Sequence, residues 1–185
     1  MTFLDTPVPW SAVFGDDRPV EVEIGPGRGE TILAFAAAQP DVNFFGVERS
    51  AGAAERIMAR AAARRLTNVR VVAGDAQLVV RGIADASVAA YHIYFPDPWP
   101  KTGHRRRRLG RGTLPREIAR TLRPGGAVHV ASDLAAVLGE LGAALEDAGL
   151  ARRRGACAPA RPTTSFERRY ATAGTHYAQF VRPAG

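Results

Sequence analysis

Residues 20–38 read VEVEIGPGRGETILAFAAA and predict a strand, a glycine turn and a helix in immediate succession. We interpret Val20–Ile24 as the strand, and the apolar, alanine-rich stretch Thr31–Ala38 as the helix. The glycines let the backbone approach a ligand closely, and the helix N-terminus offers free amides. We therefore predict a nucleotide-type binding turn that includes Gly25 and Gly27, with a plain loop as the alternative.

Two glutamates indicate which nucleotide this turn favours. The dinucleotide pattern G-x-G-x-x-G needs a glycine at position 30, where the chain has Glu30. Glu23 lies at the carboxyl end of the strand, where a carboxylate would repel a pyrophosphate but can accept a hydrogen bond from an amino group. The turn therefore favours S-adenosylmethionine over NAD, with Glu23 as a cofactor-binding candidate.

The rest of the chain continues the alternation of strands and helices. Residues 1–19 show no clear period, and we interpret them as a loose lead-in. Further strands are expected at 42–47, 69–73, 88–94, 127–131 and 175–182, helices at 51–66, 112–122 and 134–148, a turn at 123–126, and an edge strand with a loop in 151–162. This order predicts an α/β fold with a doubly wound parallel sheet, as one domain over residues 1–185.

Acidic residues follow two of the other predicted strands. Glu48 comes about twenty residues after the glycine turn, where an acid commonly accepts hydrogen bonds from ribose hydroxyls. A salt bridge from Glu48 to Arg49 or Arg56 is the structural alternative. Asp75 and the small residue Ala76 suit an adenine edge, because the carboxylate can accept from the exocyclic amine and a backbone amide can reach a ring nitrogen. Asp75 could equally cap the turn that follows it.

A proline-rich loop follows the predicted strand 88–94. It reads FPDPWPK at residues 95–101, and four arginines stand at Arg105, Arg106, Arg107 and Arg108. The prolines fix φ and remove backbone donors, so we expect a stiff loop at the carboxyl end of the strand, where open α/β sheets bind ligands. Lys101 is the only lysine of the chain, which indicates a site that needs a compact ammonium. The alternative is a proline-rich turn before a solvated charge run.

Composition narrows the class of protein. The formal net charge of +7 favours an anionic partner such as a nucleic acid, although a coding bias toward arginine would also raise it. The single cysteine excludes a disulfide framework within the chain and favours a reducing compartment. We see no signal peptide, no membrane span and no Cys/His spacing typical of a metal site, and we expect a cytoplasmic protein that is a monomer or a homodimer.

Several motifs together resemble those of the bacterial tRNA (guanine-N7)-methyltransferases. They are VEIGPGRG, GVE, GDA, FPDPWPK with its basic tail, RPGG, SD and TSFERR. The resemblance implies a Rossmann-like class I methyltransferase, with a mostly parallel doubly wound sheet and an antiparallel C-terminal edge strand. It also implies transfer of a methyl group from S-adenosylmethionine to N7 of a guanosine in the variable loop of tRNA. Members of that family usually carry a longer N-terminal segment.

The resemblance also assigns residues to the two ligands. It places Glu23, Glu48, Asp75 and Asp97 at the S-adenosylmethionine site. It assigns tRNA binding to Lys101, Asp133, Thr164, Ser165, Phe166 and Glu167.

The chemistry of methylation at N7 suggests a role for Asp97. Guanine N7 already has a lone pair, so the enzyme needs no base, and its task is positioning and electrostatics. Asp97 is the catalytic candidate because the reaction places positive charge on the purine. Asp133 or Glu167 could share the contact with the base, Trp99 or Phe166 could stack on it, and Arg105–Arg108 should contact phosphates. Burial of Trp99 under the loop is the alternative for that residue.

Three other functions compete with this interpretation. A methyltransferase for a small molecule or a protein would share the glycine turn, but it would not need the arginine run. A non-catalytic RNA-binding module with a vestigial cofactor pocket would lack S-adenosylmethionine binding. An NAD-dependent oxidoreductase is disfavoured by Glu23 and Glu30.

Overall fold

The strands form one mixed sheet of seven, in the order β3-β2-β1-β4-β5-β7-β6. The computed structural model describes residues 7, 9–98, 109–159, 161–170 and 174–184. The strands are β1 (Val20–Ile24), β2 (Asn43–Glu48), β3 (Val69–Ala73), β4 (Val88–Tyr94), β5 (Leu122–Ser132), β6 (Ala151–Arg153) and β7 (His176–Val181). β1 to β5 pair in parallel, and β7 is antiparallel to both β5 and β6. The predicted doubly wound sheet and its antiparallel C-terminal strand are confirmed, and β6 forms the outer edge.

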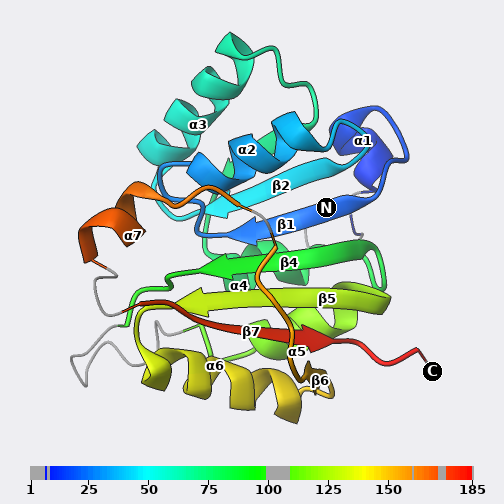
Figure 1. The fold of residues 1–185 in the computed structure, drawn as a ribbon. Helices are drawn as coiled ribbons and strands as arrows, with labels where there is room; N and C mark the ends of the chain where they lie inside the picture. The colour runs from blue at the N-terminus through cyan, green and yellow to red at the C-terminus, as the bar shows by residue number, and fades with distance from the viewer. Residues whose placement is uncertain (1–6, 8, 99–108, 160, 171–173, 185) are drawn as a thin grey trace.

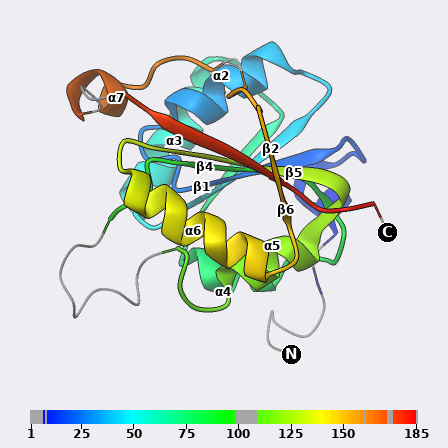
Figure 2. The ribbon, with the colours of Figure 1, turned by 60° about the horizontal axis from the view of Figure 1, so that its bottom comes forward.

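Helices cover both faces of this sheet (Figures 1 and 2). They are α1 (Trp10–Phe14), α2 (Glu30–Ala38), α3 (Ala51–Ala63), α4 (Ala76–Arg81), α5 (Leu114–Thr121), α6 (Ala135–Asp147) and α7 (Ser165–Tyr170). Tyr91 and Ile93 of β4 pack in one core with α4, α5 and α6, whereas Tyr94 packs in the other with α2 and α3. Every residue of β4 is buried, as expected for a central strand covered on both faces.

The interpretation of residues 1–19 as a loose lead-in is wrong for Trp10–Phe14, which form α1. The Trp10 indole donates to Ser87 Oγ at 3.2 Å, and its ring lies 5.1 Å from the Phe45 ring in an edge-on arrangement. Phe14 is buried in the core with α4–α6. This helix is too short to show a period in sequence, and aromatic packing against the sheet stabilises it. The short helices α4 and α7 are likewise absent from the sequence-based expectation.

The turn predicted at residues 123–126 lies inside β5 as an irregularity. Val88 pairs with Leu122 but Ala90 pairs with Ala127, so the stretch between them bulges out of the ladder. Gly125 has a φ of 75°, and its N–H donates to Arg182 O at 2.9 Å. The backbone groups of the bulge therefore form hydrogen bonds with the segment after β7. For this reason the bulge continues β5 instead of ending it.

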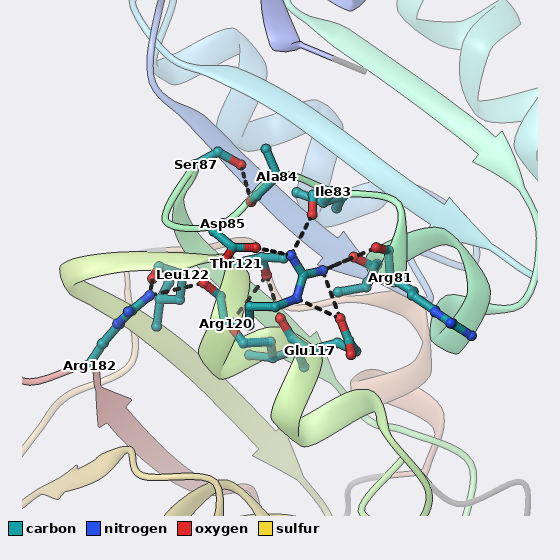
Figure 3. A network of polar contacts seen from close by, with 12 residues as sticks. Arg81, Ile83, Ala84, Asp85, Ser87, Glu117, Arg120, Thr121, Leu122 and Arg182 are labelled. Atoms are coloured by element: carbon teal, nitrogen blue, oxygen red, sulfur yellow. Dashed lines mark hydrogen bonds and ion pairs between the residues drawn. The ribbon is translucent and has the colours of Figure 1, made fainter. Parts of the chain in front are cut away.

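Arg120 links α5 to α4 and to the loop between α4 and β4 (Figure 3). This network lies at the end of the sheet opposite the carboxyl ends of the parallel strands. Arg120, on α5, donates to the backbone oxygens of Ile83 and Arg81 at 3.0 and 3.1 Å, and it pairs with Asp85 and Glu117. These contacts fix α5 against the loop between α4 and β4. We interpret the network as structural, because it stabilises the packing of α5 against α4 and the loop before β4.

The chain between β6 and α7 crosses the face of the sheet that α2 and α3 leave open. Figure 1 shows it passing over β7, β5 and β4 toward α7. The guanidinium of Arg161, in this segment, lies 4.6 Å from the centroid of the Tyr94 ring and 5.5 Å from that of Phe95. The segment thereby brings α7 to the carboxyl ends of β1 and β4.

Candidate functional site

Two adjoining hollows lie at the carboxyl ends of the parallel strands. The larger has a volume of about 630 Å³ and the smaller about 230 Å³. Four residues line both of them: Gly25, Tyr94, Phe95 and Asp97. The glycine turn and the proline loop, far apart in sequence, therefore meet where the two hollows join, as expected for a ligand site in an open α/β sheet.

The glycine turn is tied to β2 by its backbone. The Gly25 N–H donates to Val47 O and the Gly27 N–H to Glu48 Oε2, both at 2.9 Å. Gly29 has a φ of 71°, and a Cβ on it would lie 2.7 Å from Ile57 on α3. Only glycine tolerates both this conformation and this approach, so the turn positions α2 closely against α3.

The smaller hollow contains the acids that follow β2 and β3, together with Ala76. Glu48 accepts hydrogen bonds from the N–H groups of Gly27 and Ser50, each at 2.9 Å, which orients its carboxylate without an ion pair to any described residue. Asp75 caps α4 by accepting from the Gln77 N–H at 2.9 Å, as the structural alternative expected. Both carboxylates retain lone pairs for a ligand in the hollow.

Glu23 is a buried acid on the wall of the larger hollow. The residue is 5% exposed, and its Oε2 is buried without a hydrogen-bond partner among the described residues. Burial raises the pKa of Glu23 to about 8, although the Arg161 guanidinium and a hydrogen bond with the Ile32 backbone oppose the rise. A buried acceptor without a partner is costly, and it suits a ligand that supplies an ammonium group.

Replacing Glu23 with glutamine is expected to change how stability depends on pH. The folded-state pKa lies above the ordinary value, so the contribution of Glu23 to stability is fully present below pH 4.5 and is lost as pH rises toward about 8. The loss should reach about 1.4 kcal/mol per pH unit within this window. Urea unfolding from pH 4 to 9 should show that the loss is reduced in the variant.

The exposed residue Glu55 on α3 supplies a matched control for this experiment. Glu55→Gln should follow the wild-type pH profile. A Glu23→Gln profile parallel to that of the wild type would show that the Glu23 carboxyl is already solvated in the folded protein.

The proline loop leaves β4 through an unusual backbone conformation. Phe95 has a φ of 50°, which is rare for an aromatic residue, and its N–H donates to Ala131 O at 2.7 Å. This turn directs the loop so that the exposed residue Asp97 lines both hollows. The predicted positions Trp99, Lys101 and Arg105–Arg108 lie outside the described residues.

The segment TSF of the C-terminal motif closes the far wall of the larger hollow. Thr164, Ser165 and Phe166 line it, and the Phe166 ring lies 5.2 Å from the Phe95 ring. The Ser165 N–H donates to Glu30 Oε2 at 2.6 Å, which connects α7 to the first turn of α2. Glu30, which disfavours NAD in the sequence analysis, therefore also helps to position α7.

Two predicted substrate residues do not line either hollow. Asp133 directly follows β5 and is half-buried, and it is absent from the lining of both hollows. Glu167 is turned inward, where its carboxylate accepts from both terminal nitrogens of Arg161 at 2.6 and 2.8 Å and from the Thr164 N–H at 2.8 Å. Burial raises the pKa of Glu167, but these hydrogen bonds outweigh it and hold the pKa below its usual range. Glu167 thus organises the wall instead of presenting its carboxylate to the hollow.

Arg161 is the residue that sequence reasoning missed. Its side chain is 8% exposed and joins Glu167 to the rings of Tyr94 and Phe95. In sequence it is one arginine in an arginine-rich tail, and its partner lies six residues ahead, outside any helical pairing. The one sequence feature that sets Arg161 apart from the other arginines of the tail is its position just before Pro162 and the TTSFE segment.

Two further features bear on the type of site. Among the described residues, no group of three or more His, Cys, Asp and Glu side chains is arranged to hold a metal ion. No helix in the part of the chain that the structure describes is long and apolar enough to cross a lipid bilayer.

Comparison with known proteins relates the chain to methyltransferases. A family model described as "Putative methyltransferase" matches residues 17–179. Over 169 residues the chain is 40% identical to a protein of Leifsonia xyli subsp. xyli named tRNA (guanine-N(7)-)-methyltransferase, covering 85% of this chain and 73% of the relative. A protein of the same name from Nocardia farcinica is 37% identical over 192 residues, covering 96% of this chain and 71% of the relative.

The match is shorter for some relatives, and it extends to solved structures. The chain spans 59% of the length of the relative of that name from Nitrosomonas eutropha, at 36% identity over 71% of this chain. The structure of the 16S rRNA methyltransferase KamB is similar with a TM-score of 0.68 at 21% identity, over 94% of this chain and 93% of that one. The aminoglycoside resistance methyltransferase NpmB1 gives 0.64 at 20% identity, over 97% and 90%. The structural likenesses establish the fold, which is that of class I methyltransferases.

Proposed function

Since the chain belongs to the tRNA (guanine-N(7)-)-methyltransferase family, we propose that it transfers a methyl group from S-adenosylmethionine to N7 of a guanosine in the variable loop of tRNA. The observation that carries the proposal is the junction of the two hollows at Asp97. One hollow offers the acids suited to a nucleoside, and the other offers an aromatic wall suited to a base. Gly25 and Phe95 border both.

The residues present are compatible with S-adenosylmethionine. Glu23 offers a buried carboxylate oxygen without a partner, which suits the amino group of the methionine moiety. Glu48 and Asp75 keep free lone pairs in the smaller hollow, where they could accept from ribose hydroxyls and an adenine amine. At pH 7 a carboxyl with a pKa of about 8 is mostly protonated, so a cationic partner would favour its ionised form.

The proposed chemistry needs positioning and charge stabilisation from the protein. S-adenosylmethionine supplies a methyl group that is already activated on a sulfonium. In this proposal, Phe166 and Phe95 form an aromatic wall on which a guanine extruded from the RNA can stack. Asp97, at the junction, stabilises the positive charge that develops on the purine. Glu23 binds the amino group of S-adenosylmethionine in this proposal. It takes no proton from guanine, because N7 already has a free lone pair.

Incubation with unmodified tRNA and S-adenosylmethionine labelled in the methyl group tests the proposed function. The label is expected in tRNA, as 7-methylguanosine at a single position in the variable loop. Label in ribosomal RNA alone, in protein or in a small molecule would contradict the proposal. Absence of S-adenosylmethionine binding in calorimetry would favour a non-catalytic RNA-binding module.

Replacing Glu48 with alanine is expected to weaken S-adenosylmethionine binding by about tenfold or more. The change removes the acceptor for a ligand and also the acceptor that holds the Gly27 N–H, and each charged hydrogen bond contributes about 1.5–3 kcal/mol. Calorimetric titration of each ligand separately should show that tRNA affinity is retained. Glu146→Ala, an exposed change on α6, is the control, and equal S-adenosylmethionine affinity in the two variants would remove Glu48 from the cofactor site.

A further inference from the structure

A third hollow, of about 470 Å³, lies beside the glycine turn and carries three arginines. Arg28 comes from the turn, and Arg56 and Arg60 come from α3. We call it the basic hollow. The only carboxylate among its lining residues is that of Glu30.

The charge of the basic hollow is poorly compensated. Glu30 is engaged elsewhere, because its Oε2 accepts from the Ser165 N–H at 2.6 Å and its Oε1 lies 4.0 Å from Arg168 Nη2. Arg60 donates to the backbone oxygen of Arg28, which leaves its positive charge unpaired by an acid among the described contacts. The side chains of Arg28 and Arg56 are exposed, with no hydrogen bond or ion pair in the described part of the chain.

The basic hollow is continuous with the larger hollow. Gly27, Arg28 and Glu30 line both, so a ligand that leaves the aromatic wall past the glycine turn enters the field of the three arginines. Arg168 on α7 adds a fourth guanidinium next to Glu30. Several guanidiniums in a groove suit phosphodiester oxygens, which they can bind bidentately.

We propose that the basic hollow binds RNA phosphates that flank the nucleotide held in the larger hollow. The inference rests on the proposed function and extends it by assigning Arg28 and Arg56 as backbone contacts. Such contacts set the register and affinity of RNA without reading its sequence. Each phosphate contact contributes about 0.7–0.9 to the slope of log affinity against log salt concentration.

The double variant Arg28→Gln/Arg56→Gln tests this assignment, with Arg60 left intact because it supports the turn. Its matched control is Arg116→Gln/Arg123→Gln, which removes two exposed charges from α5 and from the bulge in β5. Equilibrium binding of tRNA should be measured from low to physiological salt. The hollow variant is expected to bind about tenfold or more weakly at low salt, with a slope reduced by about 1 to 2, while the control keeps the wild-type slope.

The outcomes separate this inference from the proposed function. Equal slopes for the two double variants would overturn the assignment of the basic hollow, whether or not tRNA is methylated. If the wild type binds tRNA but labels none of it, the proposed function fails, while a selective loss of slope would still support the basic hollow. No binding of tRNA by the wild type would overturn both.

Discussion

The Asp97→Ala variant is expected to lose about 100-fold or more in the turnover number for tRNA methylation, with S-adenosylmethionine binding largely retained. Asp97 lines both hollows where they join, so its carboxylate is close to any group that passes between them. A fixed negative charge stabilises the transition state more than the ground state, because the purine gains positive charge only as the methyl group moves. Single-turnover kinetics with saturating tRNA measures this step directly.

Two substitutions at this position separate charge from hydrogen bonding. Asp97→Asn keeps an oxygen that can accept from the Watson–Crick edge of guanine but removes the charge. If charge stabilisation dominates, asparagine and alanine should be similarly slow. If base recognition dominates, asparagine should recover much of the rate. Wild-type turnover in Asp97→Ala would remove Asp97 from the mechanism altogether.

The sheet was readable from sequence because its strands are short runs rich in β-branched residues, set between turn signals and alanine-rich helical stretches. The bounds of β1, β3 and β4 coincide with the predicted strands, and the alternation with helices predicted their parallel order. The same order places the residues after each strand at one edge of the sheet. The strand order therefore predicts that Gly25, Glu48, Asp75 and Asp97 lie at one edge, the resemblance assigns the three acids to one ligand, and all four residues line the smaller hollow.

Elements stabilised by contacts distant in sequence were not predictable in this way. α1 depends on the packing of Trp10 against Phe45, which is visible only once β2 is in place. The division of the site into two hollows was likewise not readable, because motif order does not say on which side of Phe95 each residue lies. Glu167 was predicted to bind substrate because of its motif, but the buried position of Arg161 turns its carboxylate inward.

Replacing Arg161 with leucine is expected to lower the free energy of unfolding by roughly 3–5 kcal/mol, because it leaves Glu167 buried without its cation. Their side chains are 8% and 12% exposed, so solvent can compensate the loss only poorly. The double variant Arg161→Leu/Glu167→Leu should regain much of this stability, since apolar side chains of similar size can replace a buried ion pair at little cost. Urea unfolding of the three proteins measures the effect.

Activity distinguishes a structural ion pair from one that also positions the site. Arg161 lies over Tyr94 and Phe95, which border both hollows, and Glu167 accepts from the Thr164 N–H on the larger one. If the pair positions this wall, the double variant should stay well below the wild type in turnover even where its stability is restored. Full turnover in a stable double variant would limit the pair to a structural role. Wild-type stability in Arg161→Leu would show that Glu167 reaches solvent once its partner is removed.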